Sequence, residues 1–264
     1  MPELPDVETL ARMLRRRTTG SRIHRVRILS PATIRSPAPR TFVRLMRGRR
    51  IERVGRRGKY LLIDLHGALT LIIHLRMTGD LAIAPADAPL HPHTRVLFAL
   101  DGEELRFVDQ RRFGHMDLLP AARVDRLSGL RRLGEEPLAR RFTLDRFRGL
   151  LRGRRGMLKA LLLRQDLVAG IGNLYADEIL FQARLRPARP AESLRPPDVA
   201  RLHGAIRAVL RRATDGLARS GSGKAAATLL DARGREGACP RCGRALAAAR
   251  VAGRGTYYCR SCQR

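Results

Sequence analysis

The spacing of apolar residues changes along the chain. Between Pro5 and Arg17, the apolar residues Val7, Leu10 and Leu14 recur at helical spacing, and this predicts an N-terminal helix. Short apolar or alternating runs, broken by Gly, Pro and Asp-Gly, then predict strands at Arg22–Leu29, Tyr60–Leu65, Leu69–Leu75, Arg95–Leu100, Glu104–Val108 and Met116–Leu119. We therefore expect a mostly antiparallel β-sandwich or barrel up to about residue 122.

The second half of the chain has a helical pattern. Helices are predicted at Thr143–Arg152, Met157–Leu163, Asn173–Ala183 and Asp198–Leu217. Ser220–Gly223 and Gly234–Gly237 are typical of loops. The predicted fold is α+β and multidomain: an antiparallel β-sandwich with its N-terminal helix (1–122), a helical domain (123–228) and a small C-terminal domain (229–264).

Charge narrows the choice of partner. The 264 residues carry 53 Lys and Arg against 24 Asp and Glu, a net charge of +29, while 44% hydrophobic content excludes a wholly disordered basic tail. No apolar run is long enough to cross a bilayer, and the acidic start of the chain does not resemble a secretory signal. We expect a cytoplasmic protein with a polyanionic partner, of which nucleic acid fits best.

The four cysteines form a metal-binding pattern. They lie in two C-x2-C pairs separated by sixteen residues: Cys239, Cys242, Cys259 and Cys262. This spacing predicts one structural Zn²⁺ with a closed shell of four thiolates, because neither redox disulfides nor idle thiols explain two such pairs in a reducing compartment. The segment from Arg244 to Tyr258 then predicts a hairpin of a zinc ribbon.

The first residues suggest covalent chemistry. If Met1 is removed, Pro2 becomes a secondary amine at the chain end, and α-amino groups titrate close to neutral pH. Such an amine can attack a sugar carbon and form an iminium, which favours β-elimination. The adjacent Glu3 carboxyl could transfer protons. A Met-Pro start alone is weak evidence for this chemistry.

Several further motifs occur in a characteristic order. They are Met1–Thr9 (MPELPDVET), Arg57–Leu62 (RGKYLL), His74–Gly79 (HLRMTG), Asp109–Gly114 (DQRRFG), Gly170–Glu178 (GIGNLYADE) and the terminal Cys-x2-Cys-Gln-Arg. Together they resemble the formamidopyrimidine-DNA glycosylases, which are bacterial base excision repair enzymes for oxidised purines. The resemblance covers nearly the whole chain, and it implies that the helical domain is a helix–two-turn–helix domain.

The resemblance also implies a role for each matching residue. Pro2 would attack the sugar C1′, Glu3 would act as general acid and base, Lys59 would contact a phosphate and assist catalysis, and Arg254 would grip phosphate. By the same resemblance the enzyme is a bifunctional glycosylase and abasic-site lyase that works by β- and δ-elimination. It is also expected to act as a monomer on double-stranded DNA with damaged bases or abasic sites.

A damaged base must leave the helix to be reached. By resemblance, Met77, Arg111 and Phe113 would fill the space that it vacates. Other residues matching DNA-contacting positions are Asn173, His93 and Arg155.

Departures from the family pattern bear mostly on the substrate. Asp6 and Gln110 replace the commoner Glu and Pro, and Ser220–Leu230 is short, rich in Ala and without the Gly-x-Pro-Gly-Tyr-like stretch that closes over extruded 8-oxoguanine. We therefore expect weaker activity on 8-oxoguanine than on formamidopyrimidines, oxidised pyrimidines or abasic sites. One alternative is an endonuclease VIII-like glycosylase for oxidised pyrimidines, and another is a DNA-damage binder that has lost turnover.

Overall fold

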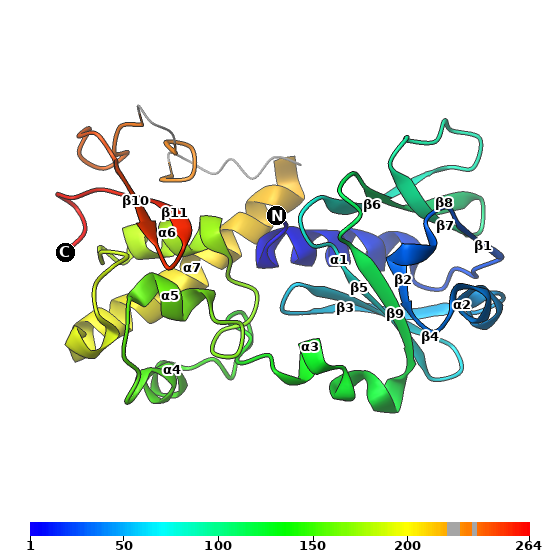
Figure 1. Ribbon diagram of the computed structural model, residues 1–264, viewed down its shortest axis with the longest axis horizontal. Coiled ribbons are helices and arrows are strands. Elements are labelled where there is room, and N and C mark those ends of the chain that lie inside the picture. Colours follow the sequence, from blue (N-terminus) through cyan, green and yellow to red (C-terminus); the bar gives the residue numbers. More distant parts are fainter. Residues whose placement is uncertain (221–227, 234–236) are drawn as a thin grey trace. The chain divides into compact units, whose positions relative to one another are not determined.

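A computed structural model describes residues 1–220, 228–233 and 237–264. The chain forms two compact units: Met1–Pro2 with Asp6–Arg131, here called the β unit, and Glu3–Pro5 with Arg132–Arg264, here called the helical unit. Figure 1 shows the elements of each. None of the helices in the described residues is long and apolar enough to cross a membrane.

The β unit contains two sheets. In the first, the order is β2 (Ile34–Ser36), β9 (His115–Pro120), β5 (Leu69–His74), β4 (Tyr60–Leu65) and β3 (Ile51–Arg57). The second has the order β1 (Arg25–Ile28), β7 (Thr94–Ala99), β8 (Glu103–Asp109) and β6 (Gly79–Pro85). Neighbouring strands are antiparallel except β2 and β9. The predicted sandwich is therefore confirmed.

Helices complete the core of this unit. The predicted N-terminal helix is α1 (Leu4–Thr18), which buries Val7, Leu10 and Leu14. A helix that we did not predict, α2 (Pro39–Met46), buries Phe42 and Met46 in the same core. Strands β2, β3 and β6 were also not predicted. In β3 only Ile51 and Val54 are fully buried, so its apolar pattern is too sparse to stand out.

The helical unit contains the four predicted helices, with ends shifted by up to three residues. They are α4 (Leu144–Leu151), α5 (Leu158–Leu163), α6 (Asn173–Gln182) and α7 (Pro196–Ser220). Thr143 caps α4 by accepting a hydrogen bond from the Arg146 amide at 3.3 Å. Leu4 joins the core of this unit, although the rest of α1 after Pro5 belongs to the β unit.

Short elements connect these parts. In chain order they are η1 (Pro31–Thr33), η2 (Ala121–Arg126), α3 (Ser128–Arg131) and η3 (Ala191–Ser193). The predicted C-terminal hairpin is formed by antiparallel β10 (Ala247–Val251) and β11 (Arg254–Tyr258). Its two turn residues, Ala252 and Gly253, both have positive φ, as tight hairpin turns require. The loops predicted at 220–223 and 234–237 lie mostly outside the described residues, as does most of the shortened 220–230 segment.

Candidate active site and zinc centre

The Glu3 carboxylate is held at the N-terminus of α6. One oxygen accepts hydrogen bonds from the amides of Gly172 at 2.8 Å and Tyr175 at 3.2 Å, and the other accepts one from Leu174 at 2.9 Å. The residue is 1% exposed. Helix N-termini favour negative charge because their first amides have no partner within the helix. The carboxylate next to Pro2 therefore has a fixed position.

Glycines before α6 allow this close approach. A Cβ at Gly172 would lie 2.2 Å from the Glu3 Cδ, and Gly170 has φ +91° and faces the Leu4 side chain. The Leu4 amide donates to the Gly170 carbonyl at 3.0 Å. Gln165 braces the same loop, because it accepts a hydrogen bond from the Gly170 amide and donates to the Ile171 carbonyl at 2.9 and 2.8 Å. The Gly170–Gly172 motif thus provides the space that Glu3 occupies.

A buried ion pair attaches the hairpin to the helices. The Lys159 Nζ lies 2.6 Å from the Asp177 Oδ1, and both side chains are 0% exposed. Lys159 also donates to the Thr256 hydroxyl at 2.7 Å, and the Asp177 carboxylate accepts from the Tyr257 amide at 3.1 Å. Burial lowers the pKa of Lys159 and raises that of Asp177, although their mutual attraction opposes both shifts.

Asn173 contacts the same hairpin strand as this pair, and Arg254 is the first residue of that strand. The Asn173 side-chain amide donates to the Gly255 carbonyl at 3.1 Å, while the Arg254 carbonyl accepts from the Thr256 hydroxyl at 2.9 Å. Glu3, Asn173 and the β11 strand that begins at Arg254 are therefore all organised around the start of α6. The Arg254 side chain is exposed.

The four cysteines have the arrangement of a metal centre. All their sulfur atoms lie within 4.8 Å of one another, with Cys239–Cys262 at 3.9 Å and Cys242–Cys259 at 3.6 Å. A tetrahedral Zn²⁺ with Zn–S bonds of about 2.3 Å would separate its sulfurs by about 3.8 Å. These distances are too long for disulfides. The four thiols therefore fit the predicted structural zinc, which would leave no open position for catalysis.

In the β unit, one buried carboxylate connects two loops. Met77 lies between β5 and β6, and Arg111 and Phe113 lie between β8 and β9. Asp109, 0% exposed, accepts hydrogen bonds from the Thr78 hydroxyl at 2.5 Å and from the amides of Arg111 at 3.2 Å and Gly114 at 2.7 Å. The two loops are thus fixed to each other.

The side chains at the tips of these loops remain exposed. Met77 is 39% exposed and Phe113 is 52% exposed, while the Arg111 guanidinium lies 4.8 Å from the Phe113 ring centre. Arg76 and Arg112, next to Met77 and Phe113, both have left-handed backbone conformations, with φ of 55° and 58°. Such conformations are uncommon for residues other than glycine and often occur at functional sites.

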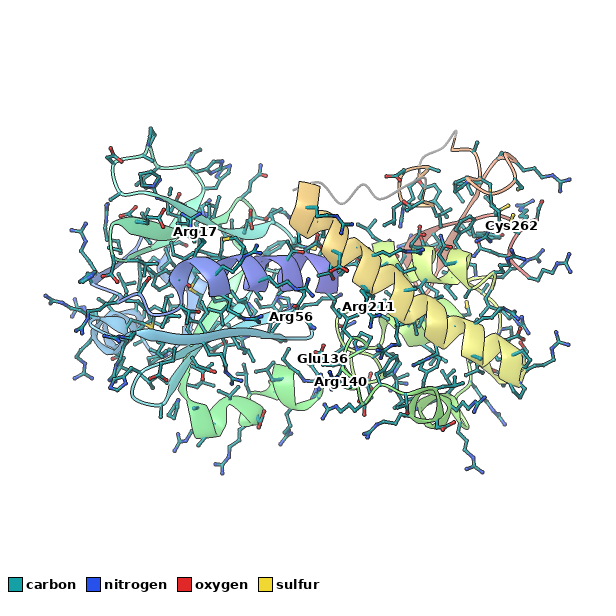
Figure 2. The ribbon with its side chains drawn as sticks, turned by 180° about the vertical axis from the view of Figure 1, so that it is seen from behind. Arg17, Arg56, Glu136, Arg140, Arg211 and Cys262 are labelled. Atoms are coloured by element: carbon teal, nitrogen blue, oxygen red, sulfur yellow. The ribbon has the colours of Figure 1, made fainter. Side chains whose placement is uncertain are left out.

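Lys59 lies in the turn between β3 and β4, where it is half-buried. Arg56 supports this turn by donating to the Gly58 carbonyl at 2.7 Å, and its guanidinium also pairs with Glu8 of α1 at 3.0 Å. Figure 2 labels Arg56. Pro2 belongs to the β unit and is half-buried, and Met1 before it is exposed.

A cluster of aromatic rings follows Lys59. Strand register places Tyr60 opposite His74 and His74 opposite His115, and the two histidine rings stack at 5.5 Å. Burial, together with nearby cationic groups such as Arg76 and Arg35, lowers the pKa of His74 to about 3 and that of His115 to about 4. Both imidazoles are therefore neutral at pH 7.

The remaining predicted residues lie in other loops. His93 lies between β6 and β7, and its carbonyl accepts a hydrogen bond from the Asp109 amide at 2.9 Å, which links it to the Met77 and Phe113 loops. Arg155 lies between α4 and α5 and lines a cavity of about 660 Å³. The other residues that line this cavity do not include Glu3, Asn173 or Arg254.

Sequence reasoning missed the residues that hold the site together: Lys159, Gln165, Asp177, Thr78 and Asp109. One signal was available, because Lys159 is one of only three lysines in the chain. The others are polar residues in motifs or turns whose burial is not visible in the sequence.

Known proteins resemble this chain along its whole length. Residues 1–116 match the formamidopyrimidine-DNA glycosylase N-terminal domain, 133–223 match the H2TH domain of the same glycosylases, and 238–264 match a zinc finger found in FPG and IleRS. Formamidopyrimidine-DNA glycosylase of Desulforamulus reducens is 44% identical over 100% of this chain and 99% of its own length. The enzyme of Moorella thermoacetica is 47% identical over 93% of both chains.

Solved structures agree with these sequence matches. Lactococcus lactis Fpg in complex with DNA containing FAPY-dG has a TM-score of 0.91 and 32% identity, over 99% of this chain and 100% of that one. The same protein with DNA containing an oxidised pyrimidine has a TM-score of 0.91 and 33% identity over 100% of both chains.

Proposed function

This chain belongs to the formamidopyrimidine-DNA glycosylase family and is a base excision repair DNA glycosylase, and we propose that it acts through Pro2 and then cleaves the abasic strand. Its ligand is double-stranded DNA with damaged bases or abasic sites, bound by a monomer in the cytoplasm. The Glu3 carboxylate carries the proposal, because three backbone amides fix its position. Glu3 directly follows Pro2 in the sequence.

The first step is displacement of the base. With Met1 removed, the unprotonated Pro2 nitrogen forms a bond to the sugar C1′ while the bond from C1′ to the base breaks. The base leaves with the electron pair of that bond and takes up a proton. The proline nitrogen then loses its proton, and the bond from C1′ to O4′ breaks as O4′ takes up a proton and becomes a hydroxyl. The product is a positively charged iminium between Pro2 and C1′.

The iminium makes strand cleavage possible because it accepts electrons. Removal of a C2′ proton breaks the bond from C3′ to the 3′-phosphate oxygen. Removal of the C4′ proton in a second elimination then breaks the bond from C5′ to the 5′-phosphate oxygen. Water finally releases the sugar remnant from Pro2. The Glu3 carboxyl transfers protons at the sugar in these steps, and Lys59 contacts the phosphate beside the lesion.

The other predicted residues bind the DNA. Met77, Arg111 and Phe113 enter the space left by the extruded base, since their loop tips are exposed and their loop bases are fixed by Asp109. Asn173, Arg254, His93 and Arg155 contact the backbone. One structural Zn²⁺, held by the four cysteines, supplies no chemistry but stabilises the hairpin that presents Arg254.

For the substrate, we propose formamidopyrimidines and abasic sites ahead of 8-oxoguanine, because of the short 220–230 segment. Oxidised pyrimidines are the second candidate, and the Lactococcus lactis complex with such DNA favours including them.

Borohydride trapping tests the mechanism. Untagged protein, whose loss of Met1 is verified by mass spectrometry, is incubated with duplexes containing an abasic site, formamidopyrimidine, 8-oxoguanine or 5-hydroxyuracil. Borohydride then reduces any iminium between protein and DNA to a stable adduct. We expect strong adducts with all except 8-oxoguanine, and Pro2→Gly should weaken trapping. Efficient 8-oxoguanine excision selective for opposite cytosine would contradict the substrate order.

Variants at Glu3 sharpen this experiment. Glu3→Gln should slow base excision by about 10²-fold or more, the effect of removing a general acid or base. Glu52→Gln is the matched control, since the Glu52 side chain is 51% exposed and forms an ion pair with the exposed His66. A wild-type protein that binds damaged duplexes but forms no adduct would favour the damage-binder alternative.

A further inference from the structure

A basic pocket lies at the C-terminal end of α6, with a volume of about 610 Å³. We call it the arginine pocket, after the six guanidinium side chains that line it: Arg184, Arg189, Arg195, Arg201, Arg241 and Arg264. They come from the loop after α6, from the start of α7 and from the zinc ribbon, which also contributes Ser261 and Cys262. Figure 2 labels Cys262 in this part of the helical unit.

Three of the arginines are held in place. Asp198, 2% exposed, accepts hydrogen bonds from Arg189 at 2.8 Å and Arg201 at 2.5 Å. Arg241 lies over the Phe181 ring at 4.4 Å and donates to the Phe181 carbonyl at 3.2 Å. Each guanidinium has five N–H donors, so these contacts fix the groups without using all of their hydrogen-bonding capacity.

The other three arginines are exposed to solvent. Arg195 has 82% of its side chain exposed and lies 3.8 Å from Asp198, and Arg184 and Arg264 are also exposed. Asp198 is the one acidic residue among the described side chains that line the pocket, and its two oxygens are already engaged. Six guanidiniums against one side-chain carboxylate leave an excess of positive charge, which favours an anion.

The arginine pocket is distinct from the site around Glu3. Glu3 binds the amides that begin α6, whereas Arg184 follows the end of this helix. Ten residues of α-helix span about 15 Å, so the two sites occupy opposite ends of one element. The side chains that line the pocket are therefore separate from those that surround Glu3.

We propose that the arginine pocket binds the phosphodiester backbone of a second nucleic-acid segment, separate from the one at the Glu3 site. Guanidinium groups bind phosphate oxygens in pairs, and their planar donors suit successive phosphates better than lysines would. The pocket's volume of about 610 Å³ is larger than one phosphate ion needs, and its arginines come from both the helices and the zinc ribbon. The contacts are to the backbone alone, so binding carries no sequence information.

Binding of a second duplex tests this proposal. The holoprotein is first saturated with a duplex containing tetrahydrofuran as an uncleavable abasic analogue, and a fluorescent undamaged 12-base-pair duplex is then titrated with anisotropy as readout. We expect the double variant Arg184→Gln/Arg264→Gln to weaken the second binding by about tenfold and to reduce its log–log salt slope by about two, one for each lost phosphate contact.

The control has the same change of charge elsewhere. Arg123→Gln/Arg126→Gln alters two exposed arginines of η2 and should leave the second affinity within about twofold. The proposal would be overturned if both double variants lost the same affinity for the second duplex, or if the wild-type protein bound no second duplex. Pocket-dependent binding of tripolyphosphate without binding of the duplex would also overturn it, since the ligand would then be a free polyphosphate.

Cleavage of an abasic duplex is the separate readout for the Pro2 chemistry. Its rate should be unchanged in the Arg184/Arg264 variant, so failure of the arginine pocket and failure of the proposed function give different results.

Discussion

The β unit and the zinc ribbon both present exposed side chains on short loops, but they hold those loops differently. The β unit has a large core between two sheets, and Asp109 fixes its Met77 and Phe113 loops with hydrogen bonds. Among its described residues, the ribbon has only a small apolar cluster, in which Leu229, Cys239 and Cys259 pack with Phe181 of α6, and Leu246 and Cys262 lie at its edge. Its hairpin therefore depends on metal and on the buried Lys159–Asp177 pair. A small structural part replaces missing core with strong, specific interactions.

Removal of zinc should produce the largest difference in stability between the two regions. The apparent binding free energy of structural Zn²⁺ in zinc-finger peptides is roughly 10–16 kcal/mol, and it is also the free energy that folds them. A chelator should therefore unfold residues 238–264 and leave the β unit folded. Hydrogen exchange should then show protection lost in β10 and β11 but retained in β4 and β5, with a large loss of DNA affinity. Normal DNA binding by the chelated protein would contradict this dependence.

Breaking the buried ion pair should have the next largest effect. Lys159→Met leaves the Asp177 charge with less compensation and should lower the free energy of unfolding of the helical unit by about 3–5 kcal/mol. Urea denaturation measures it, and Lys159→Met with Asp177→Leu should cost less than the sum of the two single changes. Additive losses would show that the pair does not act as a unit.

Loosening the Asp109 connection should affect function more than stability. Asp109→Asn replaces one acceptor oxygen with a donor group and should cost about 1–3 kcal/mol of unfolding free energy. We also expect excision to depend less on the opposite base, while trapping on single-stranded abasic DNA stays normal. Asp64→Asn, in β4 and paired with Arg53, is the control. Equal losses on both DNAs would mean that Asp109 is purely structural.

The histidine cluster should have no effect at neutral pH, and its contribution should appear only in acid. Because the folded pKa values of His74 and His115, about 3 and 4, lie below the unfolded value, the unfolded state binds protons first as pH falls. Stability should be fully present above pH 7 and decrease as the pH falls from about 6.5 to the folded pKa values of about 3 and 4, by about 1 kcal/mol per histidine between pH 6 and 5. His115→Gln should reduce the slope, whereas the exposed His66→Gln should not.

Much of this arrangement was visible in the sequence, and the reasons are local. The C-x2-C pairs predicted the thiol cluster, and the apolar spacing predicted α1 and the helices α4 to α7, because these signals depend on near neighbours in the chain. Lys159 and Asp177 could not be paired this way, because Lys159 lies inside the apolar run MLKALLL and its partners Asp177 and Thr256 are far along the chain. Nor does sequence show that Gly172 leaves space for Glu3, since that requires a contact across 169 residues.

The division of α1 between the two units has a consequence for modular engineering. Glu3, Leu4 and Pro5 count with the helical unit, although in the chain they lie between the two segments of the β unit. A gene fragment starting at Arg132 would encode a helical unit without Leu4 in its core and without the carboxylate that binds the first amides of α6. The helical unit therefore cannot be recombined as one contiguous cassette. Any chimera that transplants it must also carry over these first residues of the donor chain.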